Sequence, residues 1–235
     1  EANEEALDRG FATIEKNYAI SVERGSLSPE DKAARLSRFS RTTDYADLAD
    51  ADLIIEAVFE EMSVKKDVFG KLDKVAKAGA ILATNTSYLD VNEIASFTSR
   101  PQDVVGLHFF SPANVMKLLE IVRGDKTAPD VLATVLGVAR KIAKVPVVVG
   151  VCHGFVGNRM LGARGDDLEP LLLEGASPEQ IDKVFTGFGF PMGPFAMWDL
   201  AGLDIGWRTR KALGETAAIG DALCEQGRFG QKTGK

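Results

Sequence analysis

Along residues 39–149, short apolar runs alternate with stretches in which apolar residues recur at helical spacing. Continuous apolar runs of this length are typical of parallel strands that are covered on both faces. The stretch 60–76 instead places Val64, Val68 and Leu72 on one helical face. This alternation predicts a doubly wound, mainly parallel α/β sheet. The expected strands are 39–43, 51–59, 80–84, 104–108, 118–122 and 145–149, and the expected helices between them are 60–76, 91–96 and 129–144.

Helical patterns flank this region on both sides. Residues 2–18 have helical spacing with Asn3 as the expected N-cap, and Ser28 is the expected cap of a second helix that ends near Arg38. From about Gly150 onward no strand pattern returns. The expected helices are one over 155–173, one capped by Ser177, and a third that starts at Pro191 and continues over 198–212 with a break in the region 202–206. The chain is therefore predicted to form an α/β domain over residues 1–150 and an all-helical domain over residues 151–235.

The overall composition narrows the classes of partner. The hydrophobic fraction is 45% and the net charge is −6, which argues against nucleic acid or an anionic membrane as the main partner. No apolar run reaches the roughly 18 residues that a membrane span needs. The chain has two cysteines and two histidines, so it offers neither a disulfide framework nor paired metal-ligand spacing. A reducing compartment fits this cysteine usage.

Polar residues follow the expected strands at the edge where the carboxyl ends of parallel strands meet. Ser87 follows the strand at 80–84, His108 ends the strand at 104–108, and Glu120 lies near the start of the next. We expect His108 and Glu120 to come within hydrogen-bond distance. A carboxylate on one imidazole nitrogen leaves the other as a general base, which suits proton removal from a hydroxyl group whose carbon loses hydride. The alternative is a structural histidine that bonds a backbone carbonyl.

Several further residues admit both a functional and a structural interpretation. Ser87 can bond a substrate or cofactor, or cap the next short helix, and the residues alone favour the cap. Asn158, in the first turn of a helix, can donate to a substrate oxygen or serve helix packing. Glu60 and Lys65 can contact a nicotinamide ribose or form a solvated helix start. The glycine-rich segment 227–234 can bind phosphate or be a flexible tail, and no Gly-x-Gly-x-x-Gly occurs, which counts against a dinucleotide site.

Seven short motifs occur in order along the chain. Each is weak alone, but the ordered set is highly specific. With them the chain resembles the L-3-hydroxyacyl-CoA dehydrogenase family over essentially all of its length, and most closely the dehydrogenase region of multifunctional fatty-acid β-oxidation proteins, in which an enoyl-CoA hydratase domain precedes this region. The motifs are DLIIEAVFE at 52–60, NTS at 85–87, HFFSPA at 108–113, GFVGNR at 154–159, GFPMGP at 189–194, DLAGLD at 199–204 and GRFGQKTG at 227–234.

The resemblance implies NAD-dependent oxidation of (3S)-3-hydroxyacyl-CoA to 3-ketoacyl-CoA. His108 is then the base that takes the 3-hydroxyl proton, and Glu120 orients it. Ser87 bonds the reacting oxygen and neighbours the nicotinamide, and Asn158 helps to place the β-oxygen or the thioester carbonyl. Ser111 stands where some members carry an asparagine near the nicotinamide. The residues that match cofactor-contacting positions are Glu1, Glu60, Lys65, Ser87, Ser111 and Lys232.

The same resemblance implies a Rossmann-like NAD-binding domain, a helical C-terminal domain and NAD as the cofactor. Acyl-CoA is the expected substrate, and a homodimer through the helical domain is the expected assembly. Neither nucleic acid nor a membrane span is expected. The expected location is the cytoplasm for a bacterial protein and the peroxisome or mitochondrion for a eukaryotic one.

The family's first two strands, with the glycine-rich turn between them, would precede Glu1. That glycine turn and the helix after it hold the cofactor pyrophosphate. We therefore expect the chain to be truncated at its N-terminus and to bind NAD poorly alone. One alternative is a non-catalytic module that serves dimerisation. Another is a dehydrogenase for small β-hydroxy acids, which would rely on a catalytic lysine, and the His108–Glu120 pair argues against it.

Overall fold

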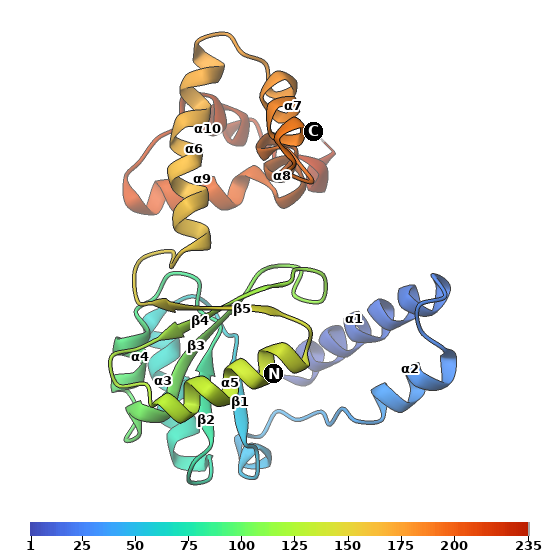
Figure 1. Cartoon of the computed structure of the whole chain (residues 1–235), viewed down its shortest axis with the longest axis vertical. Helices are drawn as coiled ribbons and strands as arrows, with labels where there is room; N and C mark the ends of the chain where they lie inside the picture. The colour runs from blue at the N-terminus through green and yellow to red at the C-terminus, as the bar shows by residue number, and fades with distance from the viewer. Residues whose placement is uncertain (235) are drawn as a thin grey trace. The chain divides into compact units, whose positions relative to one another are not determined.

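The computed structural model describes residues 1–234, apart from the side chains of Ala212 and Leu213. Its internal contacts divide the chain into two compact units, Glu1–Val156 and Gly157–Lys235. The first unit contains a sheet with helices, and the second contains helices (Figure 1). A Rossmann-like α/β fold followed by a helical domain is the predicted fold class, and this prediction is confirmed.

The sheet of the first unit has five strands in the order β1-β2-β3-β4-β5. Neighbouring strands are parallel except for β3 and β4, which are antiparallel. The predicted strand at 39–43 is wrong. That segment is coil, and Phe39 is its one large apolar residue and is 43% exposed, so the segment has no apolar face to bury. The strands are β1 (Leu53–Glu56), β2 (Ile81–Thr84), β3 (Val104–Phe109), β4 (Leu118–Arg123) and β5 (Val145–Gly150).

Helices cover both faces of the sheet, which is why its strands are nearly continuous apolar runs. On one face, α3 and α4 pack over Ile54, Leu82 and Val104. On the other face, α5 packs over residues such as Ala83 and Leu107, and Figure 1 shows it lying across the sheet. The alternation of side chains along each strand sends neighbouring residues to opposite cores. These helices are α3 (Met62–Val75), α4 (Val91–Ser96) and α5 (Pro129–Lys141).

A close approach between β3 and β4 fixes the register that matters for function. A Cβ added at Gly106 would lie 2.6 Å from Cβ of Val122, so only glycine fits there. In the resulting register Gly106 is opposite Val122, and His108 is opposite Glu120. Because β4 runs antiparallel to β3, its start lies at the same edge of the sheet as the carboxyl ends of β1, β2 and β3.

The first unit also contains two helices that project away from the sheet in Figure 1. They are α1 (Glu4–Glu23) and α2 (Pro29–Leu36), and neither has a buried residue. Both predicted N-caps are confirmed: Asn3 accepts a hydrogen bond from Ala6 N, and Ser28 accepts one from Asp31 N. The short 3₁₀ helices of this unit are η1 (Tyr45–Leu48) and η2 (Pro101–Asp103).

The second unit is built from helices joined at glycines. Gly202 has a φ of 102° and separates α8 from α9, so the break predicted in the region 202–206 is present at Gly202. A capping box between Ser177 and Gln180 begins α7, as the Ser-Pro-Glu pattern predicts. No helix in residues 1–234 is long and apolar enough to cross a membrane. The elements are α6 (Gly157–Leu173), α7 (Pro178–Phe188), α8 (Pro194–Ala201), α9 (Leu203–Leu213), α10 (Ala218–Glu225) and η3 (Gln231–Thr233).

Candidate active site

A histidine and a glutamate form a buried pair on β3 and β4. Nδ1 of His108 lies 2.8 Å from Oε2 of Glu120. The exposed fractions are 4% for His108 and 1% for Glu120. An ionised carboxylate can only accept, so Nδ1 carries the hydrogen and donates it, which leaves Nε2 as the basic nitrogen of the ring. The predicted contact between these two residues is therefore present.

Further contacts hold both members of this pair in place. The second carboxylate oxygen of Glu120 accepts a hydrogen bond of 2.9 Å from the backbone N–H of Val156. The imidazole of His108 contacts two phenyl rings, with centroid distances of 4.6 Å to Phe110 and 5.6 Å to Phe155. Phe155 is fully buried although its φ of 48° is in the left-handed region. A backbone strained in this way persists only where its surroundings require it.

Ser87 lies in the loop after β2, at the same edge of the sheet. The predicted N-cap role of Ser87 is wrong, because α4 begins at Val91 and its cap is Asp90, which accepts from the amides of Asn92 and Glu93. The N–H of Ser87 donates instead to Oε1 of Glu60 at 2.7 Å. The hydroxyl group of Ser87 is therefore not committed to capping a helix.

One interpretation of Glu60 and Lys65 was that they form a solvated helix start. The structure does not fit this interpretation for Lys65. Lys65 is completely buried and its Nζ lies 2.7 Å from Oε1 of Glu56 and 3.8 Å from Oε2 of Glu60. Glu60 is 37% exposed in its side chain, so it faces solvent at the edge of the sheet. Burial, and to a lesser extent the charge of Glu60, raise the pKa of Tyr88 above its ordinary value. Tyr88 is therefore neutral at physiological pH.

The two remaining candidates of the first unit lie on its surface. Ser111 is an exposed residue of the loop between β3 and β4. Glu1 is exposed and precedes α1, and its amino group lies 3.4 Å from the carbonyl of Thr42. Neither residue makes a contact that tests its predicted cofactor role.

The helical unit carries Asn158 and Lys232. Asn158 is the second residue of α6 and is half-buried, which agrees with the predicted first turn of a helix. Lys232 lies in η3 and its ammonium group pairs with the carboxylate of Asp204, a residue of α9. A Cβ at Gly230 would lie 2.3 Å from the carbonyl of Asp199, so the glycine-rich segment 227–234 is packed closely against α8. This packing argues against the interpretation of the segment as a free tail.

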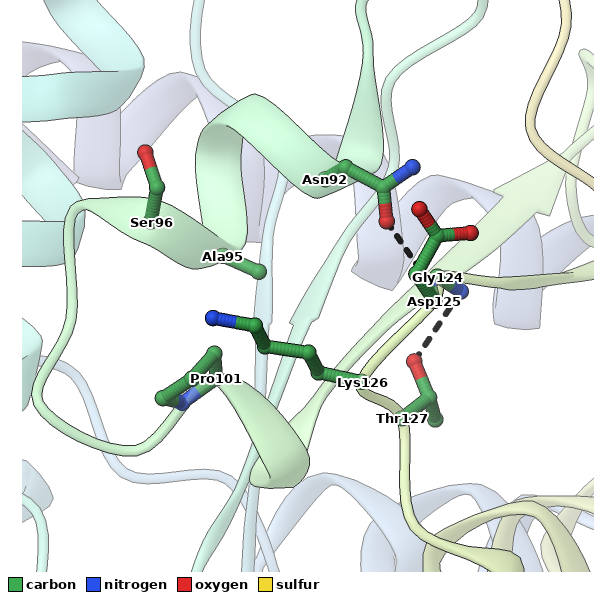
Figure 2. Close-up of a pocket in the computed structure, with 8 residues that line it drawn as sticks. All are labelled: Asn92, Ala95, Ser96, Pro101, Gly124, Asp125, Lys126 and Thr127. Carbon is green, nitrogen blue, oxygen red and sulfur yellow. Dashed lines mark hydrogen bonds between the residues drawn. The ribbon is translucent and has the colours of Figure 1, made fainter.

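A separate small pocket lies away from the paired histidine. It is formed between α4 and the segment that follows β4, near the start of β3 and thus at the opposite edge of the sheet from His108 (Figure 2). Asn92 accepts a hydrogen bond from Asp125 N at 2.7 Å, and Thr127 accepts one from Gly124 N at 3.0 Å. These two hydrogen bonds close the turn after β4. None of the predicted site residues lines this pocket. Among the described residues, no group of His, Cys, Asp and Glu is arranged to hold a metal ion.

Sequence reasoning missed several residues that complete the site. Glu56 is 5% exposed and holds Lys65, and Thr84 and Thr86 are fully buried polar residues beside it. The aromatic rings around His108 were missed as well. One signal pointed to Glu56. An acid inside the apolar run 51–59 has to be buried with its strand, and a buried carboxylate needs a partner.

Comparisons with known proteins agree with this geometry. Residues 1–152 match the family model described as "3-hydroxyacyl-CoA dehydrogenase, NAD binding domain", and residues 154–235 match the model of its C-terminal domain. The NAD-binding match confirms NAD as the cofactor that the resemblance implies.

Relatives and solved structures extend the match. The chain is 52% identical over 212 residues to the peroxisomal bifunctional enzyme of Homo sapiens, over 83% of this chain and 29% of that protein. It is 46% identical over 202 residues to the 3-hydroxybutyryl-CoA dehydrogenase of Clostridioides difficile, over 85% of this chain and 72% of that protein. The 3-hydroxybutyryl-CoA dehydrogenase structure from Escherichia coli K12 has a TM-score of 0.91 at 35% identity, over 100% of this chain and 52% of that one. The chain belongs to the 3-hydroxyacyl-CoA dehydrogenase family of NAD-dependent oxidoreductases.

Proposed function

We propose that the protein oxidises the 3-hydroxyl group of (3S)-3-hydroxyacyl-CoA to a ketone in fatty-acid β-oxidation, with hydride passing to NAD. The observation that carries this proposal is the buried contact of 2.8 Å between His108 and Glu120. Family membership and the dehydrogenase relatives support the same reaction class. The chain spans 29% of the human bifunctional relative, so the activity of the whole protein is part of this proposal.

The residues of the chain divide the chemistry between them. Nε2 of His108 takes the proton of the 3-hydroxyl group as C3 loses its hydride. The carboxylate of Glu120 keeps the ring oriented through Nδ1 and offsets the positive charge that forms on it. The hydroxyl of Ser87 donates to the reacting oxygen, and the amide of Asn158 helps to place the β-oxygen or the thioester carbonyl. The two phenyl rings beside His108 keep water from the imidazole.

The edge of the sheet suits the ribose of a nicotinamide cofactor. NAD, when bound, supplies the hydride acceptor. Oε1 of Glu60 is occupied by the loop after β2, whereas its Oε2 lies 3.8 Å from Lys65, outside hydrogen-bond distance, and can accept from a ribose hydroxyl. We assign Glu60 and Ser87 to this site, with Lys65 acting from its buried position beside Glu60, together with Glu1, Ser111 and Lys232 at the positions that the family resemblance implies.

The wider context of the protein is also proposed. Residues 1–150 form the NAD-binding domain and residues 151–235 the helical domain. The helical domain mediates a homodimer, which its exposed apolar side chains support, among them Phe188 at 85% and Val184 at 71%. The bifunctional relatives support a second, fused domain, which the family resemblance implies is an enoyl-CoA hydratase. Peroxisomal and bacterial relatives support a peroxisomal or a bacterial cytoplasmic location.

A coupled spectroscopic assay tests the activity. The purified protein is mixed with NAD and (3S)-3-hydroxybutyryl-CoA, and NADH is followed by its absorbance. The proposed function predicts steady NADH formation, which would contradict the sequence-based expectation that the chain alone binds NAD poorly. The 3R enantiomer is the matched control that gives none. A longer acyl chain, such as (3S)-3-hydroxyhexadecanoyl-CoA, measures the chain-length preference. Absence of NADH formation with every 3S substrate would refute the proposed function and favour the non-catalytic alternative, for which the comparisons give no support.

A further inference from the structure

A second cluster of charged side chains, Glu56, Lys65 and Glu60, lies at the carboxyl end of β1 and the start of α3. Its centre is Glu56, the last residue of β1, which is 5% exposed. Oε1 of Glu56 accepts hydrogen bonds from Lys65 Nζ at 2.7 Å and from Val58 N at 2.6 Å. Oε2 accepts one of 2.8 Å from the hydroxyl of Thr84, which pairs with Glu56 in the parallel register of β1 and β2. This carboxylate is therefore anchored to the ends of two strands.

Lys65 connects this carboxylate to the surface of the site. Its side chain has no exposed area, and a buried ammonium group needs a compensating charge close by. Its Nζ lies 2.7 Å from Glu56, 3.3 Å from the carbonyl of Val58 and 3.8 Å from Glu60. Because the carboxylate of Glu56 is the nearer of the two, it determines where the ammonium group lies. The contact with Glu60 is an ion pair at longer range.

Glu60 connects Lys65 to the loop that carries Ser87. One carboxylate oxygen, Oε1, accepts from the hydroxyl of Thr86 at 2.6 Å and from the backbone amides of Ser87 at 2.7 Å and Tyr88 at 2.8 Å. The other oxygen faces Lys65. Three donors that converge on one oxygen define the path of the loop backbone. The position of Ser87 therefore follows from the position of Glu60.

We propose that Glu56 is a positioning residue for the dehydrogenase reaction: through Lys65 and Glu60 it sets the loop that presents the hydroxyl of Ser87 to the substrate. This inference rests on the proposed function, in which Ser87 contacts the reacting oxygen. No proton or electron moves along the cluster, which acts through charge and geometry. The cluster starts inside the core and ends on a half-exposed carboxylate and on the active-site loop. A network that served stability alone would have no need to reach that loop.

The substitution Glu56→Gln tests the inference, because it keeps the shape of the side chain and removes its charge. Lys65 then pairs with Glu60 alone and draws that carboxylate away from the loop. We expect the Ser87 and Tyr88 amides to exchange hydrogen at least about tenfold faster, with kcat about tenfold lower and the KM for the acyl-CoA changed less than about threefold. Hydrogen exchange is measured by NMR on the protein without substrate. Amides in β3, such as those of Val105 and Leu107, report whether the change is local.

Asp73→Asn is the matched control. Asp73 lies on α3, the helix that also carries Lys65, and pairs with Arg100 at 3.2 Å. Its contacts, which include Ser99, do not reach the Ser87 loop. We expect lower thermal stability with unchanged exchange at Ser87 and unchanged kcat. The inference is overturned if Glu56→Gln leaves the exchange of Ser87 and Tyr88 unchanged. It is equally overturned if the loop opens while kcat stays at the wild-type value.

A second variant covers the case in which Glu56→Gln does not fold. The double substitution Glu56→Gln with Lys65→Met removes the buried charges as a unit, a change that protein cores often tolerate. We expect it to fold and to show the same faster exchange at Ser87 and Tyr88 as the single variant. Because exchange is read without substrate, the outcome is separable from the proposed function. The two can fail separately. If the wild type makes no NADH but the variant still shows faster exchange at Ser87 and Tyr88, the proposed reaction is refuted and the coupling of Glu56 to the loop is retained.

Discussion

The sheet unit and the helical unit hold their carboxylates in different ways. At the carboxyl edge of the sheet, Glu56 and Glu120 are 5% and 1% exposed, and strands and loops donate to both. In the helical unit, Asp204 is itself only 6% exposed, but its partners Lys232 and Arg208 have side chains that are 39% and 79% exposed. Solvent and salt screen such pairs, whereas buried pairs keep their strength and geometry. Substitution of the sheet-edge carboxylates should therefore change catalysis, and substitution of Asp204 should change mainly stability.

The largest expected effect is at His108. His108→Gln keeps a side chain that can donate to Glu120 but removes the basic nitrogen. We expect kcat to fall about 1000-fold, within the range that general-base catalysis contributes. Circular dichroism and thermal melting check that the fold is retained. A kcat within about tenfold of the wild type would contradict the role of His108 as the base.

Glu120→Gln should have the next largest effect. The amide can still accept from Nδ1 of His108 but no longer offsets the charge of the imidazolium. We expect kcat to fall about a hundredfold, less than for His108 because the base itself remains. Steady-state kinetics with saturating NAD measure this. An effect on thermal stability without any on kcat would mean that the pair is structural, as in the alternative interpretation of His108.

Ser87→Ala tests the polar contact to the reacting oxygen. The backbone N–H of residue 87 still donates to Glu60, so the loop keeps its position. Loss of one hydrogen bond in the transition state corresponds to about tenfold in kcat. The matched comparison is Ser99→Ala, whose hydroxyl bonds Asp73 at the end of α3 and not at the site. Equal kcat values for the two variants would remove Ser87 from the reaction.

The smallest effect on activity is expected at Asp204 in the helical unit. The hydrogen bond from Lys232, more than any other contact, lowers the pKa of Asp204 below its ordinary value, against the opposing effect of burial. Its contribution to stability is therefore present above the pKa of the unfolded chain, near 3.9, and is lost as the pH falls through the lower folded value. Asp204→Asn should lower the melting temperature at pH 7, and the difference should shrink as the pH falls below about 4 and vanish only below the lowered pKa of the folded state. A gap that does not depend on pH would contradict this.

The apolar pattern predicts most of the fold because burial on both faces of a parallel sheet leaves little freedom of composition. It fails at 39–43, where β-branched residues occur without an apolar face, so propensity alone did not make a strand. It succeeds at Gly202, where the predicted break in the last long helix is present and the backbone takes a positive φ that glycine permits.

The site was predicted where spacing and strand register coincide. His108 and Glu120 are close because the strand that follows β3 pairs with it in antiparallel register. The roles of Glu56 and Glu60 were harder to predict, because they depend on where a lysine five residues after Glu60 directs its ammonium group. The cap of α4 was mispredicted as Ser87, whereas it is Asp90. Both are polar residues shortly before the same helix, and only the path of the backbone decides which of them caps it.

The most direct test of the central claim is the rate of hydride transfer in a single turnover. Enzyme with bound NADH is mixed with excess acetoacetyl-CoA, and the loss of NADH absorbance is followed in the wild type and in His108→Gln. Fluorescence titration first establishes that both bind NADH equally. The account predicts equal binding and a transfer rate about 1000-fold lower in the variant, because the ketone oxygen lacks its proton donor. Equal transfer rates in the two proteins would contradict it.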